Sequence, residues 1–258
     1  MKYLLSIIML LVTLNSAAAP DAELWSFWDK SNEQNSASIS HQPWQQLLDS
    51  YLIQRGTQTL FQYGKVTEID RTKLQNYLAD LSKLDPRTFN RTEQYAYWVN
   101  LYNALTVNLI LDNYPLKSIT KLGGIFSFGP WGDQIAIINS KKLTLNDIEH
   151  RILRPIWQDA RTHYAVNCAS LGCPNLQSSA FTAQNSQALL DKAASDFINS
   201  TKGATLESGK LQLSSIYDWF SSDFGDKEAL FRHLAQYRVE LNGYSGQISF
   251  DYDWRLNE

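Results

Sequence analysis

The stretch TEQYAYWVNLYNALTVNLILDN, residues 92–113, predicts a long buried helix, and this helix decides the fold. Its apolar face consists of residues at helical spacing, which are Trp98, Tyr102, Leu105, Leu109 and Ile110. Thr92 can cap the helix, and Glu93 suits the first turn, where acidic side chains meet the positive end of the helix dipole. Tyr114-Pro115 ends the helix, because the residue before a proline avoids the α conformation.

Two amides interrupt the apolar surface of this helix. Asn100 and Asn103 are three residues apart, so they lie on one side of it. Buried amides need hydrogen-bond partners, and two interpretations are open. The amides either bond to nearby backbone groups, or they orient a catalytic imidazole or stabilise charge in a reaction.

The segments on both sides of this helix predict the α+β class. Residues 21–60 are helical in pieces, residues 74–84 form an amphipathic helix, and residues 135–143 have the pattern of a hairpin. Further helices are expected over residues 144–153, 181–200, 216–224 and 227–237. Further strands are expected over residues 161–167, 210–213 and 247–254. Helices dominate the first half and strands enter late, so we expect one α+β domain over residues 19–258.

The segment NCASLGCP, residues 167–174, contains both cysteines of the chain, Cys168 and Cys173. A cysteine between a strand and small residues can expose its sulfur in a tight turn, where backbone N–H groups stabilise a thiolate and later an oxyanion. Three other interpretations stay open: a Cys168–Cys173 disulfide, a metal site with nearby histidines, or a small buried side chain. The metal patterns C-x-x-C and H-E-x-x-H do not occur, so we expect no metal and no cofactor.

A thiol nucleophile needs a base, usually a histidine that a third polar group orients. His150 follows Glu149 on the helix predicted before the cysteines, and it reaches Cys168 if that helix packs on the sheet. We expect His150 to be the base and His163 to be the second choice, because strand alternation directs His163 away from Cys168. Glu149, like the two asparagines, is a candidate to orient the imidazole. The other two histidines, which we expect in solvent, are His41 and His233.

The first 18 residues have the layout of a secretory signal peptide. A positive start precedes an apolar run over residues 4–14 and small residues up to Ala19. The run is too short to span a membrane as a helix, and Pro20 favours cleavage after Ala18. We therefore expect a periplasmic or secreted protein with no stable membrane insertion after cleavage.

The composition excludes one class of partner. The net charge is −3 and no basic run occurs, so we do not expect binding to nucleic acid. The hydrophobic fraction of 44% can build a sizeable core in a chain of this length. The expected partner is a small-molecule or peptide substrate.

Several ordered blocks resemble the family named domain of unknown function 547, over about residues 60–257. The blocks are EQYAYWVNLYNA (93–104), YPLKSI (114–119), LTLNDIEHRILR (143–154), HYAVNCASLGCP (163–174), LSSIYDWF (213–220) and DYDWRLN (251–257). The resemblance implies a papain-like or transglutaminase-like cysteine hydrolase fold with a helical N-terminal half. Plant members with serine at the position of Cys173 imply that Cys168 is the central thiol. Because His150 precedes Cys168, whereas papain-like enzymes have the cysteine first, the resemblance also implies a circular permutation or another base.

Two functions of different classes follow. The first is a thiol-dependent hydrolase or acyltransferase that acts on an amide or peptide bond, with Cys168 as nucleophile and His150 as base. Its expected substrate is a small thiol peptide such as glutathione, or a cell-wall peptide. The second is a non-catalytic ligand- or protein-binding module with a Cys168–Cys173 disulfide. In that module, aromatic residues line a groove, and the candidates are Tyr95, Trp98, Trp131, Trp219 and Trp254.

Overall fold

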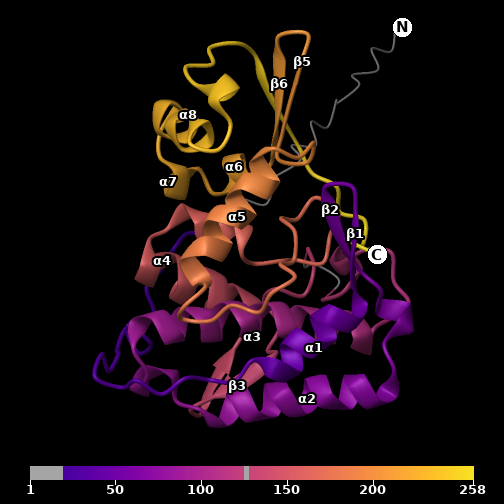
Figure 1. Cartoon of the computed structure of the whole chain (residues 1–258), viewed down its shortest axis with the longest axis vertical. Coiled ribbons are helices and arrows are strands. Elements are labelled where there is room, and N and C mark those ends of the chain that lie inside the picture. The colour runs from indigo at the N-terminus through magenta and orange to yellow at the C-terminus, as the bar shows by residue number, and fades with distance from the viewer. Residues whose placement is uncertain (1–19, 125–127) are drawn as a thin grey trace, which may run out of the picture.

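The computed structural model describes residues 20–124 and 128–258, and the predicted signal peptide lies outside these residues. Figure 1 shows a larger part with the N-terminal helices and a smaller part with a three-stranded sheet, connected by the helix α5 (Ser186–Ile198). Helices and small sheets occur together, so the predicted α+β class is confirmed.

The remaining regular elements follow one another along the described chain. The helices are α1 (Gln42–Tyr51), α2 (Glu68–Lys83), α3 (Arg91–Asp112), a π-helix η4 (Asp147–Leu153), α4 (Arg154–Trp157), α6 (Ile216–Trp219), α7 (Ser221–Phe224) and α8 (Lys227–Ala235). Single turns of 3-10 helix are η1 (Tyr63–Lys65), η2 (Pro86–Thr88), η3 (Ile119–Lys121), η5 (Ala160–Tyr164) and η6 (Val239–Leu241). The strands are β1 (Leu52–Arg55), β2 (Gln58–Phe61), β3 (Ala136–Ile138), β4 (Lys141–Leu143), β5 (Ala204–Glu207), β6 (Lys210–Ser214) and β7 (Ile248–Asp251). β1–β2 and β3–β4 are antiparallel hairpins, and β6 lies between antiparallel β5 and parallel β7.

Helix α3 forms the centre of the larger part, as the sequence predicts. Every residue from Glu93 to Val107 is buried, so the helix is covered on all faces and not on one stripe. Its N-cap is Asn90, whose side chain accepts a hydrogen bond from the Glu93 N–H at 2.9 Å. The prediction of Thr92 as the N-cap is wrong, because Thr92 already lies within the helix. Its hydroxyl donates a hydrogen bond to the side chain of the N-cap Asn90 at 2.7 Å.

Two hydrophobic clusters make up the core. The larger cluster surrounds α3 and includes the buried Trp28, Trp44 and Trp98. The smaller cluster packs α5 against β5, β6 and the last helices, around Phe197 and Tyr217. Tyr164 from η5 belongs to this second cluster, although the chain on both sides of it contributes to the first. The segment before the cysteines therefore lies at the junction of the two clusters.

Residues 161–167 do not form the predicted strand. They begin as the 3-10 turn η5, which the Asp159 side chain caps by accepting a hydrogen bond from the Arg161 N–H at 2.9 Å. His163 and Tyr164 are adjacent and both buried, which a half-buried alternating strand would not allow. Strand alternation therefore does not direct His163 away from Cys168, and that prediction is wrong.

Two other boundaries differ from the prediction for a local reason. Helix α5 begins at Ser186 and not near residue 181, because Thr182 and Asn185 form a reciprocal side-chain turn before it. The predicted helix over residues 216–224 is divided at Phe220 into α6 and α7. The hairpin over residues 135–143 is confirmed as β3 and β4.

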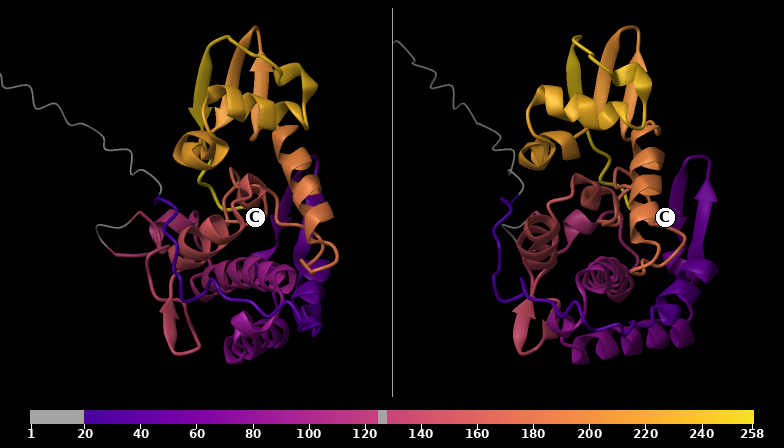
Figure 2. Two further views of the ribbon diagram at one scale, coloured as in Figure 1. Left: turned by 90° about the vertical axis from the view of Figure 1, so that its left-hand side faces the viewer. Right: turned by 60° about the vertical axis from the view of Figure 1, so that its left-hand side comes forward.

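The C-terminal residues return from the small sheet to the larger part, and Figure 2 shows this passage in yellow. After β7 the chain runs beside the cysteine segment, where Ser170 and Leu256 form an antiparallel bridge. The Leu256 N–H donates to the Lys117 carbonyl at 2.9 Å, and the Phe61 N–H donates to the Asn257 carbonyl at 2.8 Å. The tail thus fixes the cysteine segment against the larger part.

The two histidines expected in solvent are not there. His41 is buried, and its Nδ1 lies 2.6 Å from the Tyr77 hydroxyl. His233 is partly buried, and its Nε2 lies 2.9 Å from the Tyr164 hydroxyl. Both side chains pack on tyrosine rings. The prediction that they face solvent, which came from the amphipathic pattern around them, is therefore wrong.

Replacing His41 by asparagine is expected to reduce the loss of stability at acidic pH. Burial lowers the pKa of His41 to about 4, so between pH 4 and 6.5 the unfolded chain binds a proton that the native protein does not. This difference destabilises the protein as the pH falls from about 6.5 to about 4, by about 3 kcal/mol. Urea unfolding at pH 7 and pH 4.5 measures it. An unchanged pH dependence in the variant would contradict the assignment.

Candidate functional site

Cys168 lies in a turn that hydrogen bonds from the side chain of Asn167 fix on both sides of the cysteine. The Asn167 side chain accepts from the Ala169 N–H at 2.9 Å and donates to the Pro174 carbonyl at 2.7 Å. Ala169 is buried and has a φ of 57°, a backbone conformation that is strained for a residue with a side chain. Such strain persists only where the surroundings fix it, and it concentrates at functional sites.

The two asparagines of α3 bond to backbone groups. Asn103 accepts from the Asn167 N–H at 2.8 Å and donates to the Ala165 carbonyl at 2.9 Å. Asn100 makes the same pair of bonds to Phe181, at 3.0 Å and 2.7 Å. Among the described residues, both side chains bond to backbone groups and neither has a hydrogen bond to an imidazole, as the backbone interpretation expects. Asn103 acts on the site by fixing the turn that carries Cys168.

An Asn103→Ala variant is expected to unfold at a lower temperature than the native protein. The change removes both bonds to the buried segment before Cys168 and leaves a carbonyl and an N–H without these partners. Each such group costs about 1–3 kcal/mol, so we expect a loss of about 3 kcal/mol. Thermal unfolding of Asn103→Ala and of Asn108→Ala, a more exposed position on the same helix, provides the comparison. Equal melting points would contradict the holding role.

Cys168 and Cys173 are joined by a disulfide, with their Cα atoms 6.1 Å apart. The Tyr252 hydroxyl contacts both sulfurs, at 3.0 Å from Cys168 and 3.1 Å from Cys173. Cys173 is buried, whereas Cys168 is partly exposed within an otherwise buried run over residues 162–170. Of the two cysteines, Cys168 is therefore the more exposed residue. While the disulfide is intact, neither cysteine is a nucleophile.

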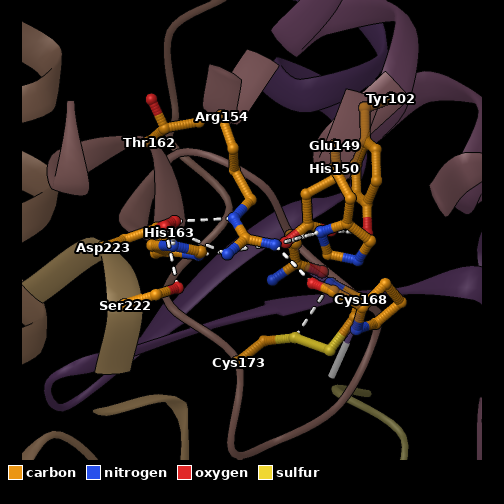
Figure 3. A network of polar contacts seen from close by, with 12 residues as sticks. Tyr102, Glu149, His150, Arg154, Thr162, His163, Cys168, Cys173, Ser222 and Asp223 are labelled. Atoms are coloured by element: carbon orange, nitrogen blue, oxygen red, sulfur yellow. Dashed lines mark hydrogen bonds and ion pairs between the residues drawn. A yellow bond between two sulfur atoms is a disulfide. The ribbon is translucent and has the colours of Figure 1, made fainter. Parts of the chain in front are cut away.

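A buried carboxylate lies between two histidines beside this turn, as Figure 3 shows. Glu149 Oε1 is 4.0 Å from Nδ1 of His150 and 3.9 Å from Nδ1 of His163. Its Oε2 accepts a hydrogen bond from the Tyr102 hydroxyl at 2.9 Å. Burial raises the pKa of Tyr252, and the Glu149 charge raises it further, so the carboxylate acts on the neighbour of the disulfide. Glu149 and His150 are on the π-helix η4, a form of helix that is frequent at functional sites.

An ion pair closes the other side of this cluster. Arg154 binds Asp223 with two hydrogen bonds, Nε to Oδ2 at 2.6 Å and Nη2 to Oδ1 at 3.0 Å. Asp223 Oδ2 also lies 2.7 Å from Nε2 of His163. Burial opposes the charge of Asp223, but hydrogen bonds from His163 and Arg154 prevail and hold its pKa below the usual range. The His163 ring stacks on Phe220, with ring centres 4.2 Å apart.

Arg154 also decides the tautomer of His150. Its Nη1 lies 3.0 Å from His150 Nδ1. A guanidinium only donates, so Nδ1 accepts and the ring proton of neutral His150 is on Nε2. Burial lowers the pKa of His150 to about 4, although the charge of Glu149 acts in the opposite direction, so this histidine is neutral at pH 7. In this arrangement His150 Nε2 is a donor and not a base.

The structure thus brings together four of the six predicted site residues, which are Glu149, His150, His163 and Cys168. It adds four polar residues that sequence reasoning missed, which are Tyr102, Arg154, Asp223 and Tyr252. Arg154 lies four residues after His150, so the i, i+4 spacing could have indicated the contact between these two side chains. Asp223 is 69 residues away from Arg154, and nothing in the local pattern indicates the pair.

Aromatic side chains gather beside Tyr252 at the edge of this site. Trp219 and Trp254 stack with ring centres 5.5 Å apart, and Trp131 meets Trp254 at 5.6 Å. These three tryptophans are partly exposed, as a ligand groove requires. Tyr95 and Trp98, the other two residues predicted for a groove, are buried in the larger cluster, and that part of the prediction is wrong.

Two further properties concern the described ranges alone. In residues 20–124 and 128–258, no helix is long and apolar enough to cross a membrane. In the same ranges, no group of three or more histidine, cysteine, aspartate or glutamate side chains is arranged to hold a metal ion.

Comparison with known proteins gives a family and no function. Residues 86–198 match the family described as "Protein of unknown function, DUF547", so the resemblance to this family is confirmed for the segment that contains α3, η4 and both cysteines. No curated protein matches the chain. No solved structure matches it either.

Proposed function

We propose, from the premise that residues 86–198 match a family of unknown function, that the protein is a thiol-dependent hydrolase or acyltransferase for amide or peptide bonds. Cys168 is the nucleophile, and the protein is active when the Cys168–Cys173 disulfide is reduced. One observation carries the proposal. Cys168, the more exposed of the two cysteines, is in a strained turn that hydrogen bonds fix, near a buried cluster of a carboxylate and two imidazoles.

The chemistry begins with reduction by a dithiol, which gives two electrons and two protons to the disulfide and becomes a disulfide itself. The Cys168 thiol then gives its proton to an imidazole, and the thiolate attacks the carbonyl carbon of the substrate. The C–N bond breaks, the leaving amine takes the proton back, and a thioester remains. Water hydrolyses the thioester, or a second amine takes the acyl group.

His150 can serve as the base if its ring proton moves to Nδ1. This atom lies between two alternatives, Arg154 Nη1 at 3.0 Å and Glu149 Oε1 at 4.0 Å. A hydrogen bond from Nδ1–H to Glu149 leaves the lone pair on Nε2, which can then accept the thiol proton. Glu149 is therefore the orienting residue of the proposed active form, and Arg154 stabilises the resting form. His163 remains the second candidate base.

The substrate and the wider setting are part of the proposal. A small thiol peptide such as glutathione, or a cell-wall peptide, offers the amide bond that this chemistry requires. The signal-peptide pattern in residues 1–18 supports export to the periplasm or the medium. The combination of thiol, imidazole and carboxylate supports a relation to papain-like or transglutaminase-like enzymes, in a permuted order.

Alkylation of Cys168 in a Cys173→Ser variant tests the proposal. Cys168 is labelled with iodoacetamide between pH 5 and 9, and the product is measured by mass spectrometry. Labelling should be rapid well below the usual pKa of a thiol, which is about 8.5. His150→Ala and Glu149→Gln should each move the profile to higher pH, whereas His233→Ala, a histidine of the smaller cluster, should not. Labelling that occurs only in urea would exclude an activated thiol.

The disulfide and the tryptophans favour a second candidate, a ligand-binding module. In this module the disulfide is permanent, and the partly exposed Trp131, Trp219 and Trp254 bind a ligand. The intact mass of the folded protein, measured before and after treatment with excess dithiothreitol, distinguishes the two functions. A disulfide that resists excess dithiothreitol in the folded protein supports the module, and ready reduction supports the enzyme.

A further inference from the structure

A second polar site lies against the loop that carries the two cysteines. It is a pocket of about 180 Å³ between that loop, the small sheet and the C-terminal tail. Leu171 and Gly172 of the loop line it, together with Lys202, Gln212 and Tyr252. Complete small-molecule sites usually have about 300–1,000 Å³, so this pocket suits one end group of a longer ligand.

Lys202 supplies a positive charge with no carboxylate of its own. Its Nζ donates to the Asn175 side chain at 2.8 Å, and among the described residues no carboxylate oxygen lies within 4.0 Å of it. Burial lowers the pKa of Lys202 to about 8, because it disfavours the charged ammonium form. An anionic group of a ligand would stabilise the ammonium form of Lys202 by forming an ion pair with it.

The acidic residues of the pocket already have partners. Asp253 binds Arg255 through Nε at 3.0 Å and also through Nη2. Asp251 accepts from the Gln212 amide at 3.1 Å. These two carboxylates oppose a ligand with several negative charges, such as a phosphate ester. A single carboxylate placed at Lys202 pairs with its charge and meets less of this repulsion, because it carries only one negative charge.

The pocket is close to the reactive sulfur. Tyr252 lines it and also places its hydroxyl 3.0 Å from Cys168 Sγ, so one tyrosine side chain connects the two sites. Gly172 permits this approach, because an added Cβ would lie 2.8 Å from the Asp253 nitrogen and 3.0 Å from the Tyr252 ring. A peptide whose end is at Lys202 can therefore present one of its last amide bonds to the sulfur.

We propose that this pocket binds the C-terminal carboxylate of a peptide and that Lys202 is its charged partner. The inference rests on the proposed function for the identity of the ligand as an amide-containing peptide. The substrate class is thus a short peptide with a free C-terminus, cleaved or transferred near that end.

Protection of Lys202 from acetylation tests the binding in the native, oxidised protein, which needs no catalytic activity. The probes are N-acetyl-alanyl-alanine and its C-terminal amide, and the readout is acetylation of each lysine by acetic anhydride at pH 8, measured by mass spectrometry. We expect the free acid to slow the acetylation of Lys202 at least about tenfold, and the amide to have no effect. Lys210, exposed on β6, is the internal control.

Binding by variants completes the test. A titration by nuclear magnetic resonance should give at least about tenfold weaker binding of the acid to Lys202→Met and unchanged binding to Lys210→Met. Equal effects of the acid and the amide, or no protection by either, would overturn the proposal. Protection by the acid together with an inert Cys168 would keep the carboxylate site and reject the enzyme, so the two failures are distinguishable.

Discussion

Cys168→Ser is expected to lose amide-cleaving activity by roughly 10³-fold or more, the loss typical of removing a covalent nucleophile. Serine at this position has a hydroxyl whose pKa is far above that of a thiol, so an imidazole base generates far less of the nucleophilic form. The measurement is release of free amine from glutathione or a cell-wall peptide in the presence of dithiothreitol. The native protein without reductant should match the variant, because its sulfur is in the disulfide.

Cys173→Ser is the matched control for this experiment. It removes the same disulfide but keeps Cys168, the more exposed cysteine, so it should be active without any reductant. Full activity of Cys168→Ser, or activity that requires Cys173, would reject Cys168 as the nucleophile.

The fold was predictable where local patterns are strong. The helix over residues 92–113 and the hairpin over residues 135–143 follow from apolar spacing and from turn chemistry, and both are present. The segment over residues 161–167 was not predictable, because its alternation coincides with a 3-10 turn buried at the junction of two clusters. Tertiary burial there overrides the strand pattern.

The candidate site was predictable in its chemistry but not in its geometry. Glu149 and His150 could be proposed from residue types beside a cysteine turn. Their orientation depends on the π-helix η4 and on Arg154, and the pattern of residues 144–153 indicates only an ordinary capped helix. Asp223 and Tyr252 come from segments far along the chain, so only the fold brings them to His163 and Cys168.

Arg154→Met is expected to destabilise the protein more than other single changes at the site, by about 3–5 kcal/mol. The side chain of Arg154 is 2% exposed, and its removal leaves the Asp223 carboxylate without the partner that it meets through two bonds. Asp223 is in the smaller part and Arg154 is in the larger part, so the loss loosens their junction. For a chain of this size, thermal unfolding should shift by on the order of 10 °C.

A double-mutant cycle distinguishes a broken pair from a damaged core. Arg154→Met with Asp223→Asn should be more stable than the sum of the single changes predicts, because no buried charge remains unpaired. Arg255→Met, which breaks a similar Arg–Asp pair at the surface, should leave the melting point nearly unchanged. The low pKa of Asp223 adds a pH test: its contribution is present above the unfolded pKa of about 4 and is lost as the pH falls below that value. Additive single effects would show that the two residues stabilise the junction independently and would contradict the coupled ion pair.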